Sequence, residues 1–113
     1  MNSISLRVYD RVCGITYRPS VGCDIDGCLL DEDGVTVRIA ILQLLTSLKD
    51  LGFDVYIWSG GGVDYAKQII RDLHIEDLVT IIPKGSETMS IAIDDIQTTM
   101  LGTINLIVSK EDA

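Results

Sequence analysis

Short apolar runs alternate along the chain with longer segments in which apolar residues recur at helical spacing. Each short run is typical of a buried β-strand. These runs lie at 20–25, 54–58, 79–82, 91–93 and 104–108. The helical spacing extends over about 36–51, where Gly52 follows in the position of a C-terminal glycine, over about 63–73, and over a short turn at 96–101. Strands that alternate with helices predict an α/β fold in which right-handed crossovers build a parallel sheet.

Residues 1–19 show a different pattern. Apolar and polar residues alternate over 4–8 and again over 15–17, which predicts a small antiparallel β-hairpin. The 113 residues are close to the commonest domain size. We therefore expect residues 1–113 to form a single α/β domain, with a central, mostly parallel sheet of about five strands and helices on its faces.

Chemically active side chains follow nearly every predicted strand. They are four aspartates, a serine and a lysine: Asp24, Asp26, Ser59, Lys84, Asp94 and Asp95. The carboxyl ends of parallel strands share one edge of the sheet, where α/β folds bind ligands. Carboxylates gathered there repel one another in a low-dielectric pocket, and a divalent cation would relieve that repulsion. The sequence therefore predicts a metal site at this edge.

The segment Asp24-Ile25-Asp26-Gly27 suits phosphoryl transfer. A carboxylate can attack phosphorus and form an acyl phosphate that water later hydrolyses, and Asp24 is placed for that role. Asp26 lies two positions further along an extended segment, so its carboxylate points to the same side and can act as the general acid and base. Mg²⁺ prefers hard oxygen ligands, which Asp24, Asp94 and the backbone carbonyl of Asp26 could supply. Asp95 could act through a bound water.

Donors and a cation for a phosphate group follow the later strands. A phosphoryl group in transfer spreads negative charge over its oxygens. The Ser59 hydroxyl and the amides of Gly60 and Gly61, where the next helix opens, are predicted to form an anion cradle. Lys84 supplies a compact positive charge that can hold the nucleophile and the phosphate together.

Each of these residues also has an ordinary structural interpretation when it is taken alone. Asp26-Gly27 could be a plain turn, and Lys84 could be a solvated loop residue. Ser59 and the pair Asp94-Asp95 could cap helices. Their joint occurrence at strand ends, in this order, favours the functional interpretation.

Charge and cysteine content narrow the function further. The net charge is −8 and the pI is near 4.3, so the chain lacks the clustered basic residues that bind a nucleic-acid backbone. Cys13, Cys23 and Cys28 form neither a paired metal motif nor an even disulfide set, and we interpret them as reduced thiols. The first twenty residues lack the pattern of a secretion signal, and no apolar run reaches membrane-spanning length. We expect a cytoplasmic protein with no membrane partner, and a nucleic-acid partner is disfavoured.

Four motifs, in this order, resemble those of the haloacid dehalogenase-like (HAD) phosphatase superfamily. They span Gly22 to Asp95, roughly two thirds of the chain, and are 24–29, 55–60, Lys84 and 91–95. The resemblance implies a Rossmann-like three-layer sandwich. It also implies that Asp24 is the nucleophile and Asp26 the acid/base. It implies that Ser59 and Lys84 stabilise the phosphate and the intermediate, and that Asp94 and Asp95 lie at Mg²⁺. With an aspartate at position 26, the chain resembles the phosphatases and phosphotransferases of the superfamily, whereas its dehalogenases lack this residue.

The chain departs from the family pattern by leaving no room for a cap domain. Only residues 28–35 separate the first motif from the first predicted helix, and no insert fits before Lys84. The resemblance is therefore to a minimal, capless phosphatase. Its phosphorylated substrate could be a small ester, covered by a neighbouring subunit of a homo-oligomer, or a macromolecular phosphate that serves as its own lid.

Two other functions compete with a phosphatase. A phosphoaspartate receiver domain has a similar length, an acidic Mg²⁺ pocket and a lysine, but it places the lysine after its acids, whereas Lys84 precedes Asp94-Asp95 here. A catalytically weak HAD-like binding module would keep the metal site without useful turnover. Every catalytic residue of the motifs is present in the sequence, which argues against this last alternative, whereas the absent cap favours it.

Overall fold

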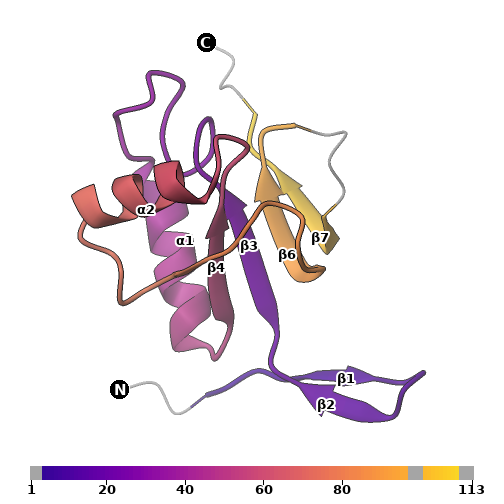
Figure 1. The fold of residues 1–113 in the computed structure, drawn as a ribbon. Helices are drawn as coiled ribbons and strands as arrows, with labels where there is room; N and C mark the ends of the chain where they lie inside the picture. Colours follow the sequence, from indigo (N-terminus) through magenta and orange to yellow (C-terminus); the bar gives the residue numbers. More distant parts are fainter. Residues whose placement is uncertain (1–3, 97–100, 110–113) are drawn as a thin grey trace.

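The computed structural model describes residues 4–96 and 101–109. Its elements, shown in Figure 1, are β1 (Val8–Asp10), β2 (Ile15–Tyr17), β3 (Ser20–Asp24), α1 (Ile39–Asp50), β4 (Asp54–Trp58), α2 (Val63–Asp72), β5 (Thr80–Ile81), β6 (Met89–Asp94) and β7 (Gly102–Ile107). Five strands form one parallel sheet in the order β5-β4-β3-β6-β7, and β1 pairs with β2 as a separate antiparallel hairpin. The predicted α/β fold, a Rossmann-like sandwich around a five-stranded sheet, is confirmed.

Strand β3 lies at the centre of the sheet and is buried over nearly its whole length. It pairs with β4 on one side and with β6 on the other. The register places Asp24 beside Trp58, the last residue of β4, and Cys23 beside Ile93 in β6. Asp24 and Asp94 therefore end two adjacent strands at the same edge, as the sequence predicted.

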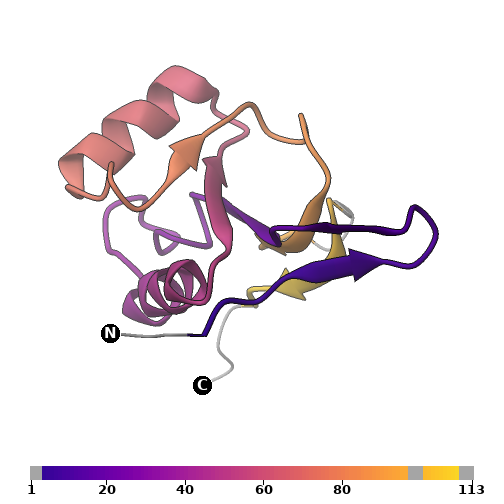
Figure 2. The same cartoon turned by 90° about the horizontal axis from the view of Figure 1, so that it is seen from below.

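Both helices cover the same face of the sheet, as Figures 1 and 2 show. Leu45 of α1 and Ala66 and Ile70 of α2 are fully or almost fully buried in one core cluster with β3 and β4. Two successive right-handed crossovers in the same direction, β3 to β4 and then β4 to β5, place their helices on a common face. Helix α1 begins at Ile39, later than the predicted residue 36, because the preceding residues pair with Leu29-Leu30 and Asp31 in a short hairpin.

The opposite face of the sheet carries no helix within residues 4–96 and 101–109. Its small apolar cluster contains Trp58, Met89 and Ala92, and the chain that connects β5 to β6 runs across it. Gly22 of β3 is necessary there, because a Cβ on this residue would lie 2.6 Å from the Trp58 ring and 2.9 Å from the Met89 side chain. The helical turn predicted over 96–101 falls largely outside the described residues.

The N-terminal hairpin β1–β2 projects from the amino edge of the sheet (Figure 1), which confirms its prediction. Most of its apolar side chains are exposed, with Tyr9 at 62% and Val12 at 96% of their full accessibility. An ion pair of 3.1 Å between Arg18 and Asp54 joins the base of the hairpin to the start of β4.

The connections that could hold a cap domain are short. Residues 25–38 form a flap whose acidic turn is closed by the Asp33 carboxylate, which accepts the backbone N–H groups of Val35 and Thr36. Residues 82–88 contain only turns. Both connections are described throughout, and neither holds an inserted domain. Among the residues that the structure describes, we find no helix with the length and apolarity needed to span a bilayer.

Candidate metal centre at the carboxyl edge of the sheet

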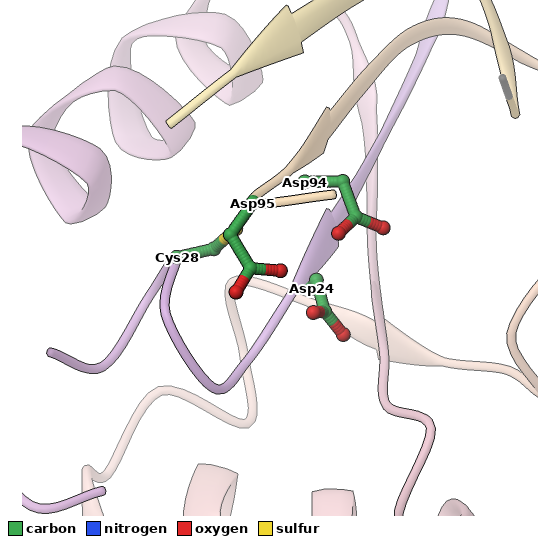
Figure 3. A group of neighbouring side chains, drawn as sticks. All are labelled: Asp24, Cys28, Asp94 and Asp95. Atoms are coloured by element: carbon green, nitrogen blue, oxygen red, sulfur yellow. The ribbon is translucent and has the colours of Figure 1, made fainter. Parts of the chain in front are cut away.

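Four side chains from three segments converge where β3 and β6 end. They are Asp24, Cys28, Asp94 and Asp95, and one ligand atom from each lies within 4.8 Å of those of the others. Figure 3 shows the three carboxylates drawn together from the ends of two strands, with Cys28 beside Asp95. Asp24 is 7% exposed and Asp94 only 3%, so most of this negative charge is withdrawn from water.

The turn after β3 brings Cys28 back toward the strand ends. The Cys28 amide donates to the Ile25 carbonyl over 3.1 Å, and Gly27 adopts a left-handed conformation with φ of 78°. A Cβ at position 27 would also overlap the Asp95 carboxylate. Only glycine satisfies both requirements, so the absence of a side chain at position 27 leaves the space that the Asp95 carboxylate occupies.

Lys84 reaches the same edge from the connection between β5 and β6. Its ammonium lies 2.9 Å from one Asp94 oxygen and 3.5 Å from one Asp24 oxygen. The connection crosses the helix-free face, to which both carboxylates belong by strand parity, so the lysine approaches them directly. A lone lysine in sequence is weak support for a site, but its position in the structure joins the two buried aspartates.

Burial and charge act against each other on Asp24. Burial raises its pKa, the Lys84 ammonium lowers it, and the Asp94 carboxylate raises it again, with a resulting pKa of about 6. Near neutral pH the ionised carboxylate of Asp24 is therefore held in an unfavourable environment. A bound cation would stabilise this ionised form.

The neighbouring groups respond differently to the same environment. Burial acts to raise the pKa of Asp94, but the Lys84 ammonium, the Ile96 amide and Asp95 outweigh it and leave this pKa below its usual value. The pKa of Asp95 is raised, first by burial and then by a hydrogen bond shared with Asp94. Burial acts to lower the pKa of Lys84, but its contacts with Asp94 and Asp24 raise it overall, so this residue remains a cation.

Ser59 follows β4 at the same edge and is 7% exposed. Its hydroxyl oxygen accepts the Gly61 amide over 2.9 Å, and its carbonyl accepts the Gly62 amide over 3.1 Å. The Gly61 amide predicted for an anion cradle is therefore engaged with Ser59. Gly60 is exposed at the tip of this turn. The role of Ser59 and Gly60 in binding phosphate stays a prediction.

Asp26 lies beside the four-residue group without contributing its carboxylate to it. The side chain is exposed and accepts a hydrogen bond of 2.8 Å from the Tyr65 hydroxyl in the first turn of α2. Gly34 of the flap faces the same carboxylate, since a Cβ there would lie 4.0 Å from it. The Asp26 carboxylate thus lies between Gly34 and α2, and the backbone carbonyl of Asp26 is still the predicted point of metal contact.

The donor set suits a cation. Three carboxylates face one ammonium, which leaves an excess of negative charge in a mostly buried site. Carboxylate oxygens favour hard divalent ions, whereas the Cys28 sulfur favours softer ones. Asp24, Cys28, Asp94 and Asp95 therefore form a group that could hold a metal ion, and the donors alone leave its identity open.

The sequence interpretation did not assign roles to two residues that the structure brings to the site. The sequence places Cys28 near the site, just past Gly27, but predicts a reduced thiol there and no metal ligand, because a cysteine without a partner motif carries no metal signal. Tyr65 had no signal, since its contact with Asp26 joins residues 39 positions apart.

No protein-family model, curated protein sequence or solved structure matches this chain.

Proposed function

We propose that this chain is a Mg²⁺-dependent phosphomonoesterase of the HAD-like, capless type, which works through an aspartyl-phosphate on Asp24. The observation that supports this most strongly is the position of Lys84, whose ammonium contacts both Asp24 and Asp94 within the carboxylate group. This lysine brings to the carboxylates the positive charge that a phosphoryl group bound next to Asp24 would need.

The reaction begins with attack by an Asp24 carboxylate oxygen on the phosphorus of the ester. The bond from phosphorus to the leaving oxygen breaks as the new bond forms, and Asp26 gives its proton to that oxygen. The Tyr65 hydroxyl orients the Asp26 carboxyl for this transfer through its 2.8 Å hydrogen bond. Water then attacks the phosphorus of the aspartyl-phosphate, Asp26 takes a proton from the water, and inorganic phosphate and free Asp24 are released.

Lys84 and Ser59 serve the transferring phosphoryl group. The Lys84 ammonium balances the charge on Asp24 and on the phosphate oxygens, and the Ser59 hydroxyl can donate its hydrogen while its oxygen accepts the Gly61 amide. Bound Mg²⁺, held by Asp24, Asp94 and the Asp26 carbonyl with Asp95 nearby, would supply further positive charge to the phosphate and favour the ionised nucleophile. Its hard-ligand preference fits the three carboxylates.

The short flap and the absence of an inserted cap leave the rim open. The substrate is accordingly either a small phosphate ester that another subunit covers or a phosphorylated macromolecule. The acidic net charge of −8 makes a nucleic-acid phosphate the less favoured of these.

The direct test is hydrolysis of a generic aryl phosphate with Mg²⁺ and with excess chelator. We expect Mg²⁺-dependent release of phosphate by the natural protein and none above background by Asp24→Asn. The matched control is Asp54→Asn, which removes the same charge at the opposite end of β4 and should keep full activity. Treatment with acetyl phosphate separates the receiver alternative, which predicts a long-lived phosphoryl group without turnover of the ester.

A further inference from the structure

The Cys28 thiol has no part in the proposed hydrolysis, yet its sulfur is one of the four ligand atoms grouped within 4.8 Å. The residue is fully buried, so the thiol faces the three carboxylates and not solvent. Mg²⁺ gains little from a sulfur ligand because it takes hard oxygen donors. The composition of the group therefore exceeds what a magnesium site requires.

The backbone holds Cys28 firmly in this place. Its amide donates to the Ile25 carbonyl, and the next amide, of Leu29, donates to the Asp24 carbonyl over 3.3 Å. The left-handed Gly27 fixes the turn from the other side. Because this turn begins at Asp24, the backbone hydrogen bonds fix the position of the sulfur relative to that carboxylate.

The other two cysteines are arranged differently. Cys23 is buried inside β3, where its thiol donates to the Asp24 carbonyl over 3.2 Å. Cys13 is exposed on the N-terminal hairpin, at the opposite edge of the sheet. Neither belongs to the group that holds the carboxylates.

We propose that Cys28 makes this group a binding site for thiophilic divalent cations, Zn²⁺ and Cd²⁺, which compete with Mg²⁺ for the same carboxylates. Zn²⁺ accepts mixed sulfur and carboxylate ligands and lies above hard divalent ions in its general affinity for protein donors. When such an ion binds, a sulfur–metal bond replaces the sulfur–hydrogen bond of Cys28, and the proton passes to solvent without any change of oxidation state. This proposal depends on the geometry of the four side chains and not on the phosphatase activity.

The proposal predicts that loss of the sulfur changes the affinities for Cd²⁺ and for Mg²⁺ by different amounts. Removal of the sulfur should weaken the binding of Cd²⁺ by about 10–100-fold or more, because the loss of a hydrogen-bond partner of a metal ligand already weakens binding by that factor. It should leave Mg²⁺ affinity within about twofold, because the three carboxylates remain in place.

The experiment is a Cd²⁺ titration followed by the ultraviolet charge-transfer absorption of the thiolate–Cd²⁺ bond. All proteins carry Cys13→Ser, so that the exposed thiol adds no signal of its own. We expect absorption that saturates with one Cd²⁺ per chain, that excess Mg²⁺ reduces, and that is lost in Cys28→Ser and Cys28→Ala. The Cys23→Ser control should keep the absorption, since its thiol points to a backbone carbonyl.

Three results would overturn the proposal: no saturable absorption in the parent protein, absorption that Mg²⁺ cannot displace, or absorption that survives in both Cys28 variants. Competition by Mg²⁺ is measured on the parent protein alone and needs no folded variant. A protein that binds Cd²⁺ in this way but fails to hydrolyse phosphate esters would refute the proposed function and leave this inference standing.

Discussion

Substitution of Asp24 by asparagine should stabilise the metal-free protein at neutral pH. Burial is the main cause of the raised pKa of Asp24, about 6 in the folded chain against about 3.9 in an unfolded one. Each pKa unit corresponds to about 1.4 kcal/mol, so the ionised carboxylate disfavours the folded state by up to about 3 kcal/mol. Asparagine removes this charge with little change of shape.

The pKa of about 6 already includes the attraction of Lys84 for the carboxylate, so the expected gain is about 3 kcal/mol. For a domain of this size, each kcal/mol raises Tm by about 3–6 °C, so the midpoint should rise by about 9–18 °C. The gain has a defined pH dependence. A carboxyl with a raised folded-state pKa makes the protein less stable as pH rises from about 4 to about 6, so the variant's advantage should be small near pH 4 and constant above about pH 6.

The assay is thermal and urea unfolding followed by circular dichroism, with chelator present, at pH values from about 4 to about 8. Asp54→Asn is the control, since Asp54 is partly exposed and pairs with Arg18, so its loss should change stability by less than about 1 kcal/mol. Added Mg²⁺ should stabilise the natural protein and have a smaller effect on the variant. A variant that is less stable than the parent at neutral pH, or a difference that does not vary with pH, would refute the argument that burial dominates at Asp24.

Three further substitutions test how the site is built. Gly27→Ala should destabilise the fold by about 2–3 kcal/mol and weaken Mg²⁺ binding, because it strains a φ of 78° and displaces Asp95. The control Gly14→Ala, with a φ of 71° and open space around it, should destabilise the fold by only about 1 kcal/mol. Equal losses of stability in urea unfolding would contradict this prediction. Lys84→Met should destabilise the metal-free protein by about 2–4 kcal/mol, since it leaves Asp24 and Asp94 without their cation. The matched control is Lys67→Met, because Lys67 is exposed on α2. Thermal unfolding of Lys84→Met that does not differ from the parent would count against the ion pairs. Tyr65→Phe should reduce kcat for an aryl phosphate by about tenfold, part of the roughly 10²–10⁴-fold that acid–base catalysis contributes, and should leave the Mg²⁺ affinity unaltered; a weaker Mg²⁺ affinity would show that Tyr65 supports the carboxylate group instead.

The parallel sheet, and the edge of it that carries the site, could be predicted because the sequence patterns that indicate them are local. Apolar runs identify buried strands, and strands that alternate with helices fix a parallel sheet, so the acids that follow β3 and β6 had to share an edge. The helix-free second face was not predicted, since the connection that covers it, residues 82–88, contains only turns and has no periodic pattern.

The details of the site depend on contacts between distant residues, which a single sequence does not display. Asp26 has the spacing of a partner to Asp24, but the turn at Gly27 and the Tyr65 hydroxyl hold its carboxylate away from the group. Cys28 enters the group because that same turn reverses the chain. The later start of α1 has a similar cause, because pairing of residues 36–38 across the flap outweighs their helical spacing.

Gly22 gives the protein a built-in optical reporter. By leaving space over β3, this glycine allows Trp58, the chain's single tryptophan, to lie fully buried beside the strand that ends in Asp24. The indole emission should therefore be blue-shifted in the folded protein and move to longer wavelength only when β3 and β4 separate. Intrinsic fluorescence can thus follow the integrity of the sheet beneath the carboxylates without any attached dye.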